Sequence, residues 1–280
     1  MGISIGQYNT LEVVREADPG LYLGTEAESV LLPWVYVPEG TKVGAQLRVF
    51  VYTDSEDRPI ATTLTPTAVV GDFAYLEVVA VTKHGAFLNW GLAKDLFAPF
   101  NELHSRLEVG DKHVFAVSLD ERDGRVKASG ELRRYFDYDV EDVEEGDEVD
   151  LLVYGKNDVG TLVVVDGRHA GIVYRDETFR TLRMGDELTG YVKLVRPDNK
   201  LDIRLQRVGA EAADDGQRIV LDALRANGGS LALHDKSSPE AIQRALGLSK
   251  KAFKRALGGL YKARRVELLD DGVKLLDEVT

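Results

Sequence analysis

The sequence contains no cysteine in its 280 residues. This absence excludes disulfide bonds, thiolate nucleophiles, cysteine-ligated zinc fingers and iron–sulfur clusters. Long apolar runs are also missing, because stretches such as residues 162–165 are far shorter than the roughly 18 residues that cross a bilayer. The N-terminal segment has no signal-peptide pattern, and Gly6 stands where a myristoylation motif needs Ser or Thr. These features predict a soluble, cytoplasmic protein with no membrane partner.

Basic residues are outnumbered, with 35 Lys and Arg against 47 Asp and Glu and a net charge of -12. On average, such a chain repels the phosphates of nucleic acids. The charge is unevenly distributed, however. Residues 211–280 carry 12 basic and 11 acidic side chains, and residues 249–265 carry seven basic side chains and no acid. The distribution of charge, rather than its sum, therefore decides where a phosphate could bind.

One pattern of about 62–66 residues occurs three times in the sequence. Each copy has two glycines 38 or 39 positions apart, namely Gly6 and Gly44, Gly71 and Gly110, and Gly146 and Gly185. Alternating apolar segments surround these glycines, and each copy supplies five of them. Five short strands in so small a unit favour a closed barrel, which leaves no exposed sheet edge, and the OB-fold is the obvious candidate.

Near Arg207 the alternation stops and helical spacing begins. We expect helices at residues 214–226, 239–246 and 250–263, and then a hairpin with an Asp-Gly turn at residues 266–276. Ser238 and Ser249 are the candidate N-caps of the second and third helices. Three helices followed by a hairpin indicate a winged helix-turn-helix.

These patterns predict a mainly β protein, with three tandem five-stranded OB-fold barrels followed by an α+β winged helix-turn-helix domain. The expected boundaries are 1–65, 66–136 and 145–210 for the barrels, 137–144 for an acidic linker, and 211–280 for the winged-helix domain. The linker contains many carboxylates and lacks the spacing of a calcium loop, so we interpret it as a solvated connection.

The second copy resembles the S1-type RNA-binding domain, an OB-fold module. The resemblance rests on VTKHGAFL at residues 81–88, on VGD at residues 109–111 and on DERDGRV at residues 120–126. In that family, aromatic residues on the second strand, a His on the third strand and an Asp and Arg on the last hairpin form the RNA face. The resemblance therefore implies a single-stranded RNA partner.

Carried onto this chain, the resemblance gives RNA-facing places in all three copies. Pro33 and Pro99 occupy the place of the family His, and Leu162 replaces the second-strand aromatic in the third copy. Exposed aromatic rings contribute about 1–3 kcal/mol for each base that stacks on them, which adds a tryptophan to the candidates. The candidates in the barrels are Tyr22, Trp34, His84, Phe87, Asp120, Arg125 and Tyr174.

The third predicted helix carries a second set of candidates. Lys250 and Lys251 lie at its N-terminus, where the helix dipole disfavours cations and where a phosphate partner would offset that cost. The complete set consists of Lys250, Lys251, Lys254, Arg255, Arg264 and Arg265. On the opposite face we expect a packed core of Ala252, Phe253, Ala256, Leu257, Leu260 and Tyr261.

The segment at residues 235–276 resembles the signature of the conserved virulence factor B family. The resemblance extends over the chain, because that family combines three S1-type domains with a C-terminal winged helix. It implies an RNA-binding regulator of gene expression, with virulence regulation in some bacteria.

No pattern in the sequence favours catalysis. The five histidines belong to no metal-ligand motif, and there is no P-loop, dinucleotide-binding loop or nucleophile elbow. We therefore predict no catalytic residue, metal, cofactor or small-molecule substrate, and an RNA-binding regulator as the function. Two alternatives stay open. One is a DNA-binding transcription regulator that uses the winged helix, and the other is a protein-interaction adaptor on the ribosome or RNA polymerase.

Overall fold

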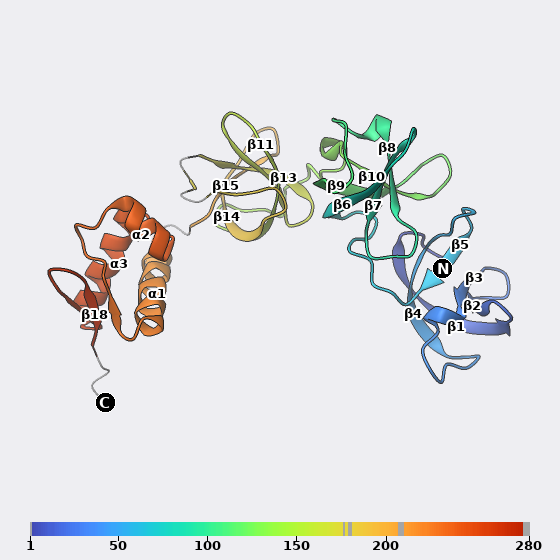
Figure 1. Cartoon of the computed structure of the whole chain (residues 1–280), viewed down its shortest axis with the longest axis horizontal. Coiled ribbons are helices and arrows are strands. Elements are labelled where there is room, and N and C mark those ends of the chain that lie inside the picture. The colour runs from blue at the N-terminus through green and yellow to red at the C-terminus, as the bar shows by residue number, and fades with distance from the viewer. Residues whose placement is uncertain (1, 176, 179–180, 207–209, 277–280) are drawn as a thin grey trace. The chain divides into compact units, whose positions relative to one another are not determined.

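The computed structural model describes residues 2–175, 177–178, 181–206 and 210–276. These residues form three closed barrels of five strands each and a helical domain with a small three-stranded sheet. Figure 1 shows the first barrel in blue, the second in green, the third in yellow and the helical domain in orange to red. The predicted fold class is confirmed. No helix in the described part of the chain is both long and apolar enough to cross a membrane.

The strands of the three barrels follow one another at equivalent places. The first barrel contains β1 Gln7–Ala17, β2 Gly20–Gly24, β3 Ser29–Pro33, β4 Gln46–Thr53 and β5 Pro59–Thr62. The second contains β6 Phe73–Val81, β7 Gly85–Asn89, β8 Leu96–Pro99, β9 Lys112–Leu119 and β10 Val126–Ser129. The third contains β11 Glu148–Lys156, β12 Gly160–Val165, β13 His169–Tyr174, β14 Glu187–Val195 and β15 Leu201–Arg204. In each barrel the third strand runs parallel to the fifth, which closes the sheet.

The second glycine of each repeat has a structural reason. Its φ is 89° at Gly44, 94° at Gly110 and 86° at Gly185, in the left-handed region that glycine adopts without steric cost. Each of these N–H groups donates to a carbonyl in the first strand of its barrel, at Val13, Val78 and Val153 respectively. The first strand has its bulge directly after the same valines. The regular glycine spacing in the sequence therefore marks one repeated contact between the first strand and the turn before the fourth.

The chain leaves the sheet at a proline after two of the third strands. In the first barrel β3 ends at Pro33 and the 3-10 turn η1 Trp34–Tyr36 follows. The second barrel does the same, with β8 ending at Pro99 before the 3-10 turn η2 Phe100–Glu102. Proline has no N–H to donate to a neighbouring strand, which explains the end of both strands.

The joint between the first two barrels is hydrophobic, and most of the first-barrel core forms a separate cluster of its own. Phe50 and Tyr52 of β4 belong to the same buried cluster as the interior of the second barrel. The Trp90 ring meets Phe50 and Tyr52 edge-on, at centroid distances of 5.7 and 6.2 Å. The Gln7 side chain also donates to the Val70 carbonyl at 2.6 Å. Barrels one and two therefore form one packed unit.

The acidic linker is less solvated than its charge predicted. Val140 is buried and Val143 partly buried, and both belong to the core of the third barrel. Asn199 of that barrel donates to the Tyr138 carbonyl at 2.8 Å. The carboxylates between these two valines are exposed. The segment therefore packs two apolar side chains, three residues apart, into the core of the third barrel and presents its charges to water.

The helical domain contains α1 Ala210–Ala226, β16 Ser230–Leu231, α2 Pro239–Leu246, α3 Lys250–Lys262, β17 Val266–Leu268 and β18 Val273–Leu275. The sheet order is β16-β18-β17, and a separate core lies between the sheet and the helices. Both predicted caps form, because Ser238 Oγ accepts from the Ala241 N–H and Ser249 Oγ from the Ala252 N–H.

Two details of the helical domain differ from the prediction. Helix α1 begins at Ala210 rather than at residue 214. Tyr261, expected in the core, has 58% of its surface exposed, whereas its neighbour Leu260 is buried. The buried side of α3 is centred between Phe253 and Leu260, and Tyr261 lies at the edge of that stripe, next to the basic face.

Candidate nucleic-acid interface

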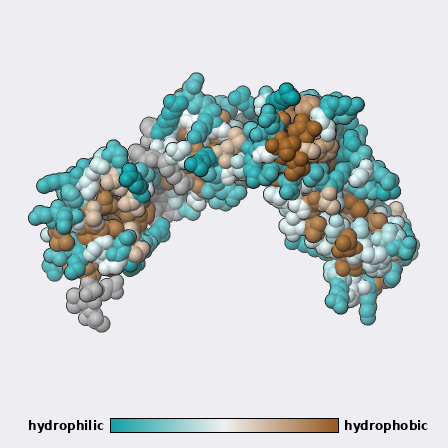
Figure 2. All heavy atoms as spheres, viewed as in Figure 1, coloured by the Kyte–Doolittle hydropathy of each residue, from teal (hydrophilic) through white to brown (hydrophobic). Residues whose placement is uncertain are grey.

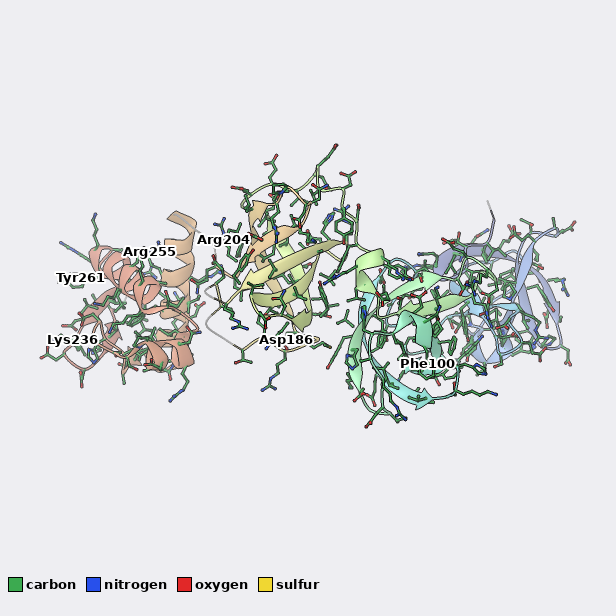
Figure 3. All side chains as sticks on the ribbon, turned by 90° about the horizontal axis from the view of Figure 1, so that it is seen from above. Phe100, Asp186, Arg204, Lys236, Arg255 and Tyr261 are labelled. Atoms are coloured by element: carbon green, nitrogen blue, oxygen red, sulfur yellow. The ribbon has the colours of Figure 1, made fainter. Side chains whose placement is uncertain are left out.

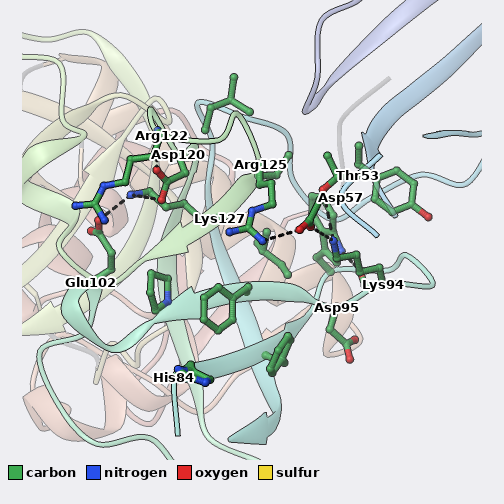
Figure 4. Close-up of a pocket in the computed structure, with 18 of the residues that line it drawn as sticks. Thr53, Asp57, His84, Lys94, Asp95, Glu102, Asp120, Arg122, Arg125 and Lys127 are labelled. Carbon is green, nitrogen blue, oxygen red and sulfur yellow. Dashed lines mark hydrogen bonds and ion pairs between the residues drawn. The ribbon is translucent and has the colours of Figure 1, made fainter. Parts of the chain in front are cut away.

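A cleft of about 1110 Å³ opens on the second barrel, between strands β7 and β8 and the β9–β10 hairpin. The β4–β5 hairpin of the first barrel lies at its margin (Figure 4). Four residues predicted from the sequence line this cleft, namely His84, Phe87, Asp120 and Arg125. The structure therefore brings the second-barrel candidates together at one place.

The aromatic floor of the cleft consists of two rings. Phe87 of β7 lies directly opposite Phe97 of β8, with ring centroids 5.2 Å apart and planes tilted by 46°. Both rings are half-buried, while their neighbours Leu88 and Leu96 point into the barrel. Phe97 was not among the sequence candidates, although the period of two along a strand places it on the opposite face from its neighbours Leu96 and Ala98. Two adjacent rings on one sheet face can stack unpaired bases.

The equivalent places in the other barrels differ. In the first barrel Tyr22 lies opposite Leu31, and the Arg15 guanidinium covers the Tyr22 ring at 3.5 Å from its centroid. In the third barrel Leu162 occupies the place of Phe87. The paired rings are therefore a feature of the second barrel.

The charge of the cleft is unlike that of the chain. Six Lys and Arg side chains and five Asp and Glu side chains line it, a difference of +1 against -12 for the whole sequence. The basic residues are Lys83, Lys94, Arg122, Arg125, Lys127 and Arg134. Of these six, only Arg125 was among the sequence candidates. Lys94, Arg122, Lys127 and Arg134 have acidic neighbours along the chain, so a local sum of charge does not reveal them, and Lys83 is an isolated cation in its segment.

Glu102 holds one of these cations in place. Its side chain is 7% exposed, and its carboxylate accepts a hydrogen bond from Lys127 Nζ at 2.8 Å (Figure 4). A second hydrogen bond comes from Ser129 Oγ at 2.7 Å. Burial alone would raise the pKa of Glu102, but the two hydrogen bonds hold it below its ordinary value. Because Lys127 pairs with Phe97 in the parallel register, its position beside the rings is fixed by the barrel.

The two hairpin candidates of the second barrel, Asp120 and Arg125, have different ionic partners. The Arg125 guanidinium contacts Asp123 at 2.5 Å and Asp57 of the first barrel at 3.0 Å, while Asp120 lies 3.6 Å from Lys127 Nζ. The matching pair in the first barrel does form, with Arg58 and Asp54 2.7 Å apart. The β9–β10 loop is one residue longer than the β4–β5 loop, and this extra residue places Asp123 next to Arg125.

Two other candidates lie outside the cleft. Trp34 is 45% exposed in η1, and its ring N–H donates to the Asp18 carbonyl at 2.7 Å. The Tyr174 hydroxyl of the third barrel donates to Asp202 at 3.3 Å. Asp202 occupies the fifth-strand position at which the second barrel has Lys127. A carboxylate at this position disfavours phosphate, so the third barrel offers a weaker anion site than the second.

The basic candidates of the helical domain are divided by exposure. Lys251, Lys254, Arg255 and Arg264 are exposed, whereas Lys250 and Arg265 are half-buried. Figure 3 labels Arg255 together with the exposed Tyr261, both on α3. The third helix therefore presents an aromatic ring beside its cations, a combination that the sequence analysis missed by assigning Tyr261 to the core.

Part of the cost of cations at the start of α3 is offset within the domain. The pKa of Glu240 in α2 is lowered, chiefly by a backbone hydrogen bond at its helix N-terminus and by Ser238, with a smaller contribution from Lys250. The half-buried Lys250 thus has an acidic neighbour, and the exposed Lys251 is the better candidate for a phosphate. Within the described part of the chain, no group of three or more His, Asp or Glu side chains is placed to hold a metal ion.

Comparison with known protein families finds a match for each of the two domain types. Residues 5–64 match the S1 domain family, and residues 218–275 match the family described as a CvfB-like winged helix domain. The S1 match lies on the first barrel, whereas the sequence motifs pointed to the second. The chain is thus a multidomain protein that combines an S1 domain and two further barrels of the same fold with a winged helix. These domain types suggest a nucleic-acid-binding protein.

The relatives extend over almost the whole chain. The Bacillus subtilis protein YitL is 28% identical over 93% of this chain and 90% of its own length. Conserved virulence factor B of Staphylococcus epidermidis is 25% identical over 94% of this chain and 92% of its own length. A solved structure of a multidomain protein with nucleic acid binding domains from Streptococcus pneumoniae is 25% identical, with coverage of 98% and 99% and a TM-score of 0.45. The predicted resemblance to the conserved virulence factor B family is confirmed.

Proposed function

We propose that this chain is a non-enzymatic RNA-binding regulator of gene expression that acts in the cytoplasm. The observation that carries the proposal is the cleft of the second barrel, in which the Phe87 and Phe97 rings lie among six basic side chains. The family resemblance supports a regulatory role, because relatives named conserved virulence factor B match this chain over 94% of its length and 92% of their own.

The geometry favours single-stranded RNA over duplex DNA. Bases in a duplex are stacked on one another, so the two rings can be covered only by bases that are unpaired. The cations at the rim of the cleft are suited to the phosphates between such bases. The basic face of α3 supplies a second contact on the same chain, and two weak contacts on one chain reinforce each other through their effective concentration.

The test is fluorescence anisotropy with a labelled, pyrimidine-rich single-stranded RNA, compared with duplex DNA over a series of salt concentrations. Truncating either ring, Phe87→Ala or Phe97→Ala, is expected to weaken RNA binding about tenfold, since each base loses its stacking partner. The wild-type chain is expected to prefer RNA and to lose affinity steeply as salt rises.

Phe100→Ala is the matched control, because Phe100 is an exposed aromatic of the same barrel that does not line the cleft. We expect it to bind RNA within about twofold of the wild type, well short of the loss of a stacked base. A preference for duplex DNA, or unchanged affinity of Phe87→Ala with an intact melting transition, would contradict the proposal.

A further inference from the structure

A carboxylate of the first barrel reaches the cations of the second-barrel cleft. Asp57 lies in the hairpin between β4 and β5, with a φ of 61° that places it in the left-handed region. Its Oδ1 is 3.4 Å from Lys94 Nζ, and its Oδ2 is 3.0 Å from Arg125 Nη1. Figure 4 shows the three side chains converging at the edge of the cleft.

Through this contact Asp57 pairs with two of the six basic side chains that line the cleft. Lys94 Nζ also donates to the Asp54 carbonyl at 2.6 Å, so the hairpin of the first barrel satisfies this ammonium group almost completely. Arg125 shares its guanidinium between Asp57 and Asp123. A phosphate that enters the cleft next to the rings must therefore compete for these groups with carboxylates of the chain itself.

We propose that Asp57 is an intrachain competitor of the RNA phosphate, so that the first barrel lowers the affinity of the second-barrel cleft for RNA. This inference rests on the proposed function and adds a regulatory contact to the same site. A carboxylate presents two oxygens to Arg125 and Lys94 much as a phosphate does. When RNA binds, its phosphate takes the place of Asp57 on both cations.

The exposure of Asp57 and Arg125 means that a phosphate can replace the carboxylate on the cation. The side chains of Asp57 and Arg125 are 48% and 45% exposed, and ion pairs at such exposure are weak and screened by salt. The two barrels do not depend on this contact for their packing, because Trp90 and Phe50 bury the apolar joint between them. Removing the charge of Asp57 should therefore leave the fold intact.

The decisive variant is Asp57→Asn in the full-length chain. Asparagine accepts the left-handed backbone of this position, so the substitution removes the charge without straining the hairpin. The matched control is Glu56→Gln, because Glu56 is the preceding residue, is 70% exposed and pairs with Arg58 rather than with a cleft cation. Both variants lose one negative charge from the same hairpin.

We expect Asp57→Asn to bind the single-stranded RNA about three- to tenfold more tightly than the wild type at low salt. The slope of log affinity against log salt should steepen by about 0.7 for each cation released to a phosphate. Glu56→Gln should stay within about twofold of the wild type, because only the general field changes. Equal affinities of the two variants, or weaker binding by Asp57→Asn with an unchanged melting transition, would overturn the inference.

Tripolyphosphate provides a test that does not depend on RNA. Its binding is followed through the Arg125 side-chain N–H signal in a nitrogen-15 NMR spectrum, and Asp57→Asn should saturate at a lower concentration than the wild type. If wild type and Asp57→Asn both fail to bind RNA but differ in this assay, the proposed function fails and the competition stands. If both bind RNA but do not differ in either assay, the competition fails and the proposed function stands.

Discussion

The carboxylate of Glu102 is nearly removed from water, and its partners determine what it contributes. It receives one hydrogen bond from an ammonium group and one from a buried hydroxyl, on Lys127 and Ser129. Removing one charged partner of such a cluster leaves the other charge half-buried and uncompensated. The resulting loss of stability is larger than the net stabilisation that the ion pair contributes. Glu102 thus supports both the stability of the second barrel and the position of a cleft cation.

We predict that Glu102→Ala destabilises the second barrel by about 2–3 kcal/mol and that Glu102→Gln costs about 1 kcal/mol, because the amide oxygen can still accept from Lys127 while the amide N–H can donate to the Ser129 hydroxyl. The folded-state pKa of Glu102 lies below its ordinary value of 4.5. The stabilising effect of the charge is therefore present above pH 4.5 and is lost as the pH falls through the lowered folded-state pKa. Urea unfolding at pH 7 and below pH 4.5 checks this, and a difference between wild type and Glu102→Gln that grows at low pH would contradict it.

At the scale of the element, the end of α3 combines a strained backbone with a side chain that we propose contacts nucleic acid. Arg264 has a φ of 55°, and its N–H donates to the Tyr261 carbonyl while the Arg265 N–H donates to the Leu260 carbonyl. This is the Schellman arrangement, in which glycine normally occupies the left-handed place. An arginine there costs about 1 kcal/mol relative to glycine, and the proposed contact of its cation with nucleic acid would offset that cost.

We predict that Arg264→Gly stabilises the helical domain by up to about 1 kcal/mol and at the same time weakens RNA binding. Thermal unfolding and anisotropy on the same sample measure both effects. Lys262→Ala is the control, because it removes a charge of the same helix end from a residue in ordinary helical conformation. A lower melting temperature for Arg264→Gly would show instead that the arginine side chain stabilises the fold by packing.

At the scale of the whole molecule, stability is divided among separate cores. Phe50 and Tyr52 of the first barrel belong to the cluster around Trp90 of the second barrel, while the rest of the first-barrel core, the third barrel and the helical domain each form a cluster of their own. A contact network that includes strands of two barrels couples their unfolding, and cores without shared residues unfold independently. The second-barrel cleft lies at the edge of the cluster around Trp90.

We predict that Trp90→Ala lowers the free energy of unfolding by about 3–5 kcal/mol. Amide hydrogen exchange should become faster in both β4 and β7 and stay unchanged in α3. Trp90 is 2% exposed and contacts rings of the first barrel, so its removal opens the core from both sides. Phe253→Ala is the reciprocal variant, since Phe253 is fully buried in the helical domain. Faster exchange confined to the second barrel in Trp90→Ala would mean that the barrels unfold separately.

Much of the architecture follows from local patterns that need no knowledge of the fold. The glycine spacing predicted three repeats because every repeat makes the same left-handed turn, as at Gly110. Ser238 and Ser249 predicted the starts of two helices because a cap is satisfied within three residues. The exposure of a residue at the edge of an amphipathic helix face was harder to predict from the sequence. Tyr261 lies at the boundary between the apolar stripe and the basic face of α3. The roles of the individual site residues stay predictions.

The sequence by itself determined the kind of domain, the number of barrels and the basic character of α3, because each of these depends on periodicity and on neighbours along the chain. Only the tertiary structure decided which side chains share the cleft. Phe97 meets Phe87 through strand pairing, Lys127 joins them through the parallel closure of the barrel, and Asp57 arrives from another barrel. Contacts of this kind join residues that are 10 to 68 positions apart in the chain, and barrel closure and the packing of two barrels bring them together.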